Sequence, residues 1–167
     1  MSALHTFVPL VATAPVLVGI TWIDHRTKRI PDRLSLLGFA TAVATMTVLS
    51  LVDGTTGDLA RAATGAVLLT GILGTLHLIR PDGLGMGDVK LALTLGLLLG
   101  WTRATTLEVA LMIAWCLMLA SALGLATVAY RMRTDGVPAR GTAVPFGPAL
   151  CAGAAAVTVF GPTFLTV

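Results

Sequence analysis

The sequence predicts an all-α membrane protein, a polytopic bundle of six transmembrane helices. Of its 167 residues, 56% are hydrophobic and only 11% are charged, whereas a soluble domain carries about 25% charged residues. Apolar stretches also recur along the whole length, separated by short polar breaks. We therefore expect residues 1–167 to form a single membrane-embedded domain, without a separate soluble one.

A helix needs about 20 apolar residues to cross the bilayer core. Six segments reach or approach this length, and the first lacks the basic residues that begin a cleaved signal peptide, so we interpret it as a retained helix. Turns or loops are expected at 53–58 and in the basic stretch 131–141. The expected helices cover residues 7–23, 34–52, 62–79, 89–101, 109–130 and 144–167.

The fourth segment is too short to span the membrane alone. Residues 89–101 make about 20 Å of helix at 1.5 Å per residue, against a core of about 30 Å. We therefore expect residues 83–87 to be non-helical and to dip below the membrane surface, which is tolerated where protein or a water-filled cavity surrounds the backbone. This arrangement places Asp88 in a shielded, partly wet recess.

Basic residues predict the orientation of the bundle. With six helices, the loops and helix ends on one side hold nine Lys or Arg residues, and those on the other side hold only Arg61 and Arg103. By the positive-inside rule the first side is cytoplasmic and both termini face outward. Asp24 and Asp88 then lie on the same cytoplasmic side. The nine basic residues are Arg26, Lys28, Arg29, Arg33, Arg80, Lys90, Arg131, Arg133 and Arg140.

Asp24 and Asp88 are the candidate catalytic residues. An ionisable group at the edge of a membrane helix is costly unless it is paired or wetted, so its default interpretation is functional. Gly85 and Gly87 precede Asp88, and without a Cβ they permit positive φ and the close approach of an extended peptide. We expect Gly85, Gly87 and Lys90 to contact the substrate.

Structural roles for these aspartates stay open at this point. Asp88 follows glycine and precedes an apolar run, which also fits an ordinary helix N-cap. Asp24 also fits a solvated carboxylate that pairs with Arg26 or Lys28. Asp32 fits a cap after Pro31, and Asp82 fits a Pro-Asp-Gly turn.

Two aspartates at matching depth in a site of low dielectric constant cannot both ionise cheaply. They titrate together, sharing one proton, and one apparent pKa is raised. Such a pair is able to activate water: the ionised carboxylate takes a proton from the water while the protonated partner polarises the scissile carbonyl. The pattern therefore points to hydrolysis without a covalent intermediate.

Other chemistries lack their motifs. Cys116 and Cys151 lie in apolar runs and are interpreted as small core residues, and the three histidines are scattered. No His-Glu-x-x-His pair and no usable serine triad occurs, so we expect neither a metal nor another cofactor. The net charge of +3 reports orientation in a multipass protein, and no nucleic-acid partner follows.

Three motifs in order resemble the type IV prepilin peptidases, membrane aspartyl proteases of the Gly-x-Gly-Asp class. They are Asp24 followed by a basic loop ending in Arg29-Ile30-Pro31, then Gly85-Met86-Gly87-Asp88-Val89-Lys90-Leu91, and finally Pro145-Phe146-Gly147-Pro148. The resemblance covers nearly the whole chain, including the six-helix count. It implies that Asp24 and Asp88 form the catalytic dyad.

Two departures from the family pattern stand out. Ile30-Pro31-Asp32 replaces the usual Ile-Pro-Asn, which matters little at a cap because Asp and Asn cap about equally. Many bacterial members also carry an N-terminal segment with paired Cys-x-x-Cys motifs, associated with N-methylation, and this sequence has none. We therefore expect the short, peptidase-only form, without N-methyltransferase activity.

The resemblance implies a multipass protein of the bacterial inner membrane with its active site facing the cytoplasm. Its implied substrate is a type IV prepilin-like precursor, whose cytoplasmic basic leader is cleaved ahead of a hydrophobic helix. The alternative is a noncatalytic multipass transporter or pilus-assembly protein in which the aspartates handle protons or ions. The sequence does not indicate an oligomeric state.

Overall fold

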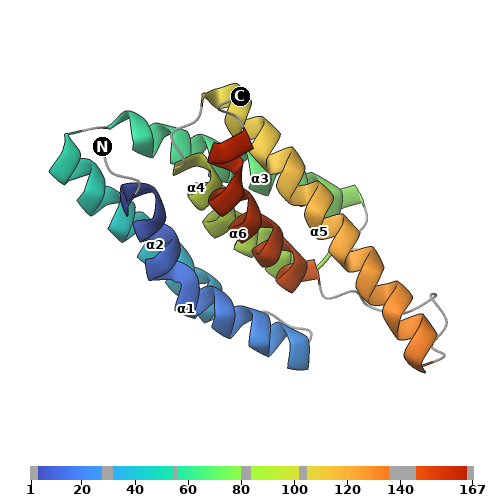
Figure 1. The fold of residues 1–167 in the computed structure, drawn as a ribbon. Helices are drawn as coiled ribbons and strands as arrows, with labels where there is room; N and C mark the ends of the chain where they lie inside the picture. The colour runs from blue at the N-terminus through green and yellow to red at the C-terminus, as the bar shows by residue number, and fades with distance from the viewer. Residues whose placement is uncertain are drawn as a thin grey trace.

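The computed structural model describes residues 4–27, 32–54, 56–79, 84–101, 105–135 and 146–164. These residues form six α-helices, and successive helices run in opposite directions through one bundle (Figure 1). The all-helical prediction is therefore confirmed for the described residues. The helices are α1 (Leu4–Thr27), α2 (Asp32–Asp53), α3 (Gly57–Ile79), α4 (Met86–Trp101), α5 (Thr106–Asp135) and α6 (Phe146–Phe164).

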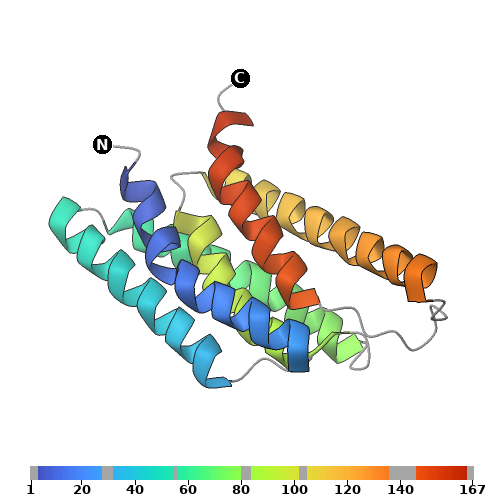
Figure 2. The same cartoon turned by 60° about the horizontal axis from the view of Figure 1, so that its bottom comes forward.

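Helix α4 is the central element of the bundle. It contacts each of the other five helices, and every residue from Thr94 to Trp101 is buried. Helices α1 and α2 pack on one flank and α5 and α6 on the other, while the C-terminal part of α5 diverges from the bundle (Figures 1 and 2). The apolar run after Asp88 thus forms the core rather than a lipid-facing surface.

Glycines bring α3 and α4 into close contact. A β-carbon on Gly96 of α4 would lie 2.5 Å from the Gly65 carbonyl oxygen and 2.6 Å from the Ala66 Cα, both in the α3 backbone. Small residues at a helix crossing let two backbones approach and gain dispersion energy. This crossing fixes the helix that carries Asp88.

Within the described residues, four helices are long and apolar enough to cross a membrane: α1 over Phe7–Asp24, all of α2, all of α3, and α5 over Leu107–Tyr130. Helix α6 holds a shorter apolar stretch, Phe146–Val159. With 16 residues, α4 is about 24 Å long, still less than a core of about 30 Å. By length and composition, four of the described helices are therefore candidate membrane spans. Six spanning helices remain a prediction.

Several helix ends differ from the sequence-based prediction. Helix α3 begins at Gly57 and α5 continues to Asp135, so parts of the expected turn 53–58 and loop 131–141 are helical. Charged residues disfavour a membrane span but do not stop a helix. The negative charge of Asp58 in the first turn of α3 even stabilises the helix, because it interacts with the positive end of the helix dipole. Helix α1 likewise continues past Ile23 to Thr27.

The start of α4 is also corrected. Met86 and Gly87 are helical, although we expected residues 83–87 to be non-helical; Leu84 and Gly85 lie outside the helix, and residue 83 is not among the described residues. Among the described glycines, only Gly54 has a positive φ, of 65°, so Gly85 and Gly87 do not use the positive φ that glycine permits. Asp88 is in the first turn of α4 and not at its N-cap.

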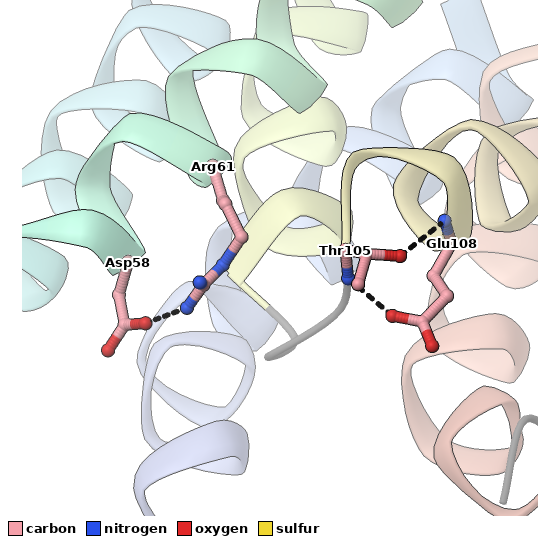
Figure 3. A network of polar contacts seen from close by, with 4 residues as sticks. All are labelled: Asp58, Arg61, Thr105 and Glu108. Carbon is pink, nitrogen blue, oxygen red and sulfur yellow. Dashed lines mark hydrogen bonds and ion pairs between the residues drawn. The ribbon is translucent and has the colours of Figure 1, made fainter.

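Polar contacts stabilise the N-terminal ends of α3 and α5 at the opposite end of the bundle from Asp88. Arg61 donates to the Asp58 carboxylate, and Thr105 and Glu108 form a capping box, in which the Glu108 N–H donates to Thr105 Oγ1 at 3.4 Å (Figure 3). Such reciprocal bonds satisfy the free N–H groups that begin a helix.

Candidate active site

Asp24 and Asp88 lie close together at one end of the bundle. Asp24 is in the last turn of α1 and Asp88 in the first turn of α4, two helices in direct contact. The two residues are only 6% and 8% exposed. The structure therefore brings the two predicted residues together, and Asp24 is not the solvated carboxylate of the alternative interpretation.

Burial and charge act together on Asp88. Removal from water and, to a smaller extent, the negative charge of Asp24 together raise its pKa from an ordinary 3.8 to about 6, although a hydrogen bond from the Gly85 backbone lowers it. Desolvation disfavours the charged form of an acid, and a nearby like charge does the same. Asp88 therefore keeps its proton to a higher pH, up to about 6, than an exposed aspartate does.

Gly85 contacts Asp88 through its backbone in both directions. The Asp88 N–H donates to the Gly85 carbonyl oxygen at 3.0 Å, and the Gly85 backbone in turn lowers the pKa of the Asp88 carboxyl group through a hydrogen bond. A β-carbon on Gly85 would lie 3.6 Å from Asp88 Oδ2, an ordinary contact distance. The glycine therefore orients the carboxylate, and its predicted contact with the substrate remains a prediction, as does that of Gly87.

Cys151 and Thr21 complete the surroundings of the two carboxylates. Cys151, on α6, lies near both aspartates, and its thiol is within hydrogen-bonding reach of Thr21 on α1. The Thr21 hydroxyl itself donates to the Leu17 carbonyl at 2.9 Å. We interpreted Cys151 as a core residue from its sequence, and no local pattern marks either side chain as a neighbour of the aspartates.

Lys90 joins the N-terminal ends of α4 and α2. Its ammonium donates to Asp32 Oδ1 at 2.6 Å, and the side chains of Lys90 and Asp32 are 41% and 74% exposed. Asp32 is the first residue of α2, in agreement with a role at the helix start. The role of Lys90 in substrate binding remains a prediction, and Asp82 lies outside the described residues.

Metal-ligand side chains do not gather elsewhere in the described part of the chain. No group of three His, Cys, Asp or Glu residues is placed to hold a metal ion among those residues. No metal-binding residue is assigned.

Arg26 lies two residues after Asp24 in the sequence. Its guanidinium is 4.6 Å from the centre of the Trp22 ring, a cation–π contact.

Comparison with known proteins agrees with the motifs. A family model described as the type IV leader peptidase family matches residues 11–130, which include both aspartates. The chain belongs to this family. The resemblance inferred from the three motifs is thereby confirmed.

Curated relatives carry a related name. Prepilin leader peptidase/N-methyltransferase from Burkholderia pseudomallei strain 1026b is 34% identical over 155 residues, covering 89% of this chain and 45% of the relative. The protein of the same name from strain K96243 gives the same values. The chain thus spans less than half the length of these relatives, and no solved structure matches it.

Proposed function

We propose that this protein is a membrane aspartyl endopeptidase that removes the cytoplasmic leader from type IV prepilin-like precursors. The observation that carries the proposal is the buried pair Asp24 and Asp88, joined at one end of α1 and α4. Membership of the type IV leader peptidase family supports it. The name of the curated relatives supports the choice of substrate.

The proposed reaction uses one water and one shared proton. The ionised carboxylate removes a proton from the water, and the water oxygen attacks the scissile carbonyl carbon. The protonated carboxyl group donates its proton to the carbonyl oxygen. The tetrahedral intermediate then breaks the C–N bond, and a proton passes to the leaving amine. We assign the initial proton to Asp88, because burial and the Asp24 charge raise its pKa to about 6.

The surroundings suit a substrate that arrives from the bilayer. The aspartates lie at the end of the bundle where Arg26, Arg33 and Lys90 also lie, which supports a cytoplasmic orientation by the positive-inside rule. We propose a multipass protein of the bacterial inner membrane, with the precursor's leader on that side and its hydrophobic helix in the lipid. Methyltransferase activity is not part of this proposal.

The direct test is cleavage of a prepilin-like precursor by the purified protein in detergent. We expect a shortened product that mass spectrometry places at the junction of leader and helix. The same precursor is given to a family member of known activity, so that a poor substrate is recognised. If the relative cuts and this protein does not, the aspartates require the other interpretation, as groups that handle protons or ions.

A further inference from the structure

A hydrogen bond connects the end of α3 to the segment that precedes Asp88. His77 is in the last turn of α3, and its Nδ1 lies 2.7 Å from the Leu84 carbonyl oxygen. A carbonyl oxygen only accepts, so Nδ1 carries the proton in this contact. The Leu84 side chain also packs against the hydrophobic core, so this residue is held on two sides.

The carbonyl that accepts from His77 belongs to the same peptide unit as the Gly85 N–H. The Gly85 backbone lies against the Asp88 carboxylate: a β-carbon on Gly85 would be 3.6 Å from Asp88 Oδ2, and the backbone of Gly85 lowers the pKa of this carboxyl group. The Gly85 carbonyl also accepts the Asp88 N–H at 3.0 Å. A peptide unit is planar, so fixing the direction of its C=O also fixes the direction of its N–H. Hydrogen bonds in such a series polarise and strengthen one another.

We propose that His77 is a positioning residue of the peptidase: through the peptide unit between Leu84 and Gly85, its imidazole N–H aims a backbone donor at the Asp88 carboxylate. The inference rests on the proposed function for its effect on cleavage. Its structural part, the fixing of that peptide unit, stands on the contacts alone. His77 itself does not touch the reacting atoms.

Three substitutions separate this role from simple packing. His77→Leu removes the donor and keeps an apolar side chain of similar reach. His77→Asn places an amide N–H close to where Nδ1 lies, and His77→Gln carries its amide one bond further out. Leu78→Ala, next in sequence and 81% exposed, is the matched control.

We expect His77→Leu and His77→Gln to lower kcat about tenfold with KM unchanged, the effect of losing about one hydrogen bond. His77→Asn should retain kcat within about threefold of the wild type, and Leu78→Ala should retain it fully. Thermal unfolding in detergent is measured for each variant. Equal loss in His77→Asn and His77→Leu, or wild-type kcat in His77→Leu, overturns the proposal.

Amide hydrogen exchange tests the structural part without a substrate. We expect the Gly85 amide to exchange about tenfold faster in His77→Leu than in wild type or His77→Asn, with exchange in the middle of α3 and α4 unchanged. This outcome with an inactive wild type would refute the proposed function and leave the positioning contact intact. Unchanged Gly85 exchange in His77→Leu refutes the positioning role.

Discussion

Asp24 and Asp88 lie near enough that the charge of one raises the pKa of the other, although α2 and α3 separate them in the chain. Both are buried where helices α1 and α4 meet. Carboxylates that share a proton act as one unit, so removing either member removes the function of both.

We therefore expect Asp24→Asn and Asp88→Asn each to abolish cleavage, and the double variant to be no worse than either. An amide neither takes a proton from water at neutral pH nor donates one as an acid. The measurement is the initial rate of leader removal from a prepilin-like precursor in detergent.

Asp32→Asn is the matched control for these changes. It makes the same isosteric replacement at a residue whose side chain is 74% exposed, at a helix start where Asn caps about as well as Asp. We expect near-normal cleavage. Substantial cleavage by a well-folded Asp88→Asn protein would exclude Asp88 as a catalytic acid or base.

The raised pKa of Asp88 also predicts how stability depends on pH. The folded protein binds this proton up to about pH 6 and the unfolded chain only up to about 3.8. Between these values the folded state binds more protons, so stability falls as pH rises through the window and the loss is complete above it. The rise in pKa corresponds to roughly 3 kcal/mol at full effect.

Asp88→Asn lacks this ionisation, so the variant should gain stability over wild type as pH rises from about 4 to about 6, with a constant difference above. Thermal unfolding in detergent across this range is the measurement, with Asp32→Asn as control. A difference that is the same at pH 4 and pH 7 would contradict the burial and pairing of Asp88.

The helices and the two aspartates could be predicted from the sequence, because both depend on local sequence pattern. Apolar runs of sufficient length predict helices, and Asp24 and Asp88 adjoin such runs within recognisable motifs. Helix ends were less predictable. Residues 131–135 continue α5, because charged side chains end a membrane-spanning segment but do not end a helix. Hydropathy marks the first kind of boundary and not the second.

The neighbours of Asp88 were beyond prediction because they come from distant parts of the chain. Cys151 lies on α6 and Thr21 on α1, and only the packing of these helices brings them to the carboxylates. His77 was one of three scattered histidines in the sequence, and its contact with Leu84 depends on how α3 packs against α4. The sequence marked Gly85 for the conformational freedom of its backbone, whereas in the structure its carbonyl oxygen accepts a hydrogen bond from the Asp88 N–H.

Lys90 offers a test of the predicted substrate contact. Its ammonium has three donors, of which Asp32 accepts one, and we predict that another donates to a peptide carbonyl of the precursor. We expect Lys90→Ala to raise KM several-fold and Asp32→Ala to leave KM near normal. An exposed ion pair contributes only about 0–1 kcal/mol, so neither change should lower thermal stability by more than that. Equal rises in KM for both variants would assign the effect to the ion pair and not to substrate binding.

The last prediction concerns the crossing that holds α4 in place. Gly96→Ala puts a β-carbon 2.5 Å from the Gly65 carbonyl oxygen and 2.6 Å from the Ala66 Cα. These are backbone atoms that cannot move aside as a side chain would, so the helices must separate, and overpacking of this kind costs about 1–3 kcal/mol or more.

Gly71→Ala is the matched control on α3, because a β-carbon there has nothing within 4 Å and alanine is the better helix former. We expect Gly96→Ala to lower the thermal unfolding temperature in detergent and to reduce cleavage, since α4 carries Asp88 to its place beside Asp24. Gly71→Ala should do neither. Because both changes add one methyl group to a helix, a similar result for the two would show that the crossing of α3 and α4 does not determine the position of the carboxylates.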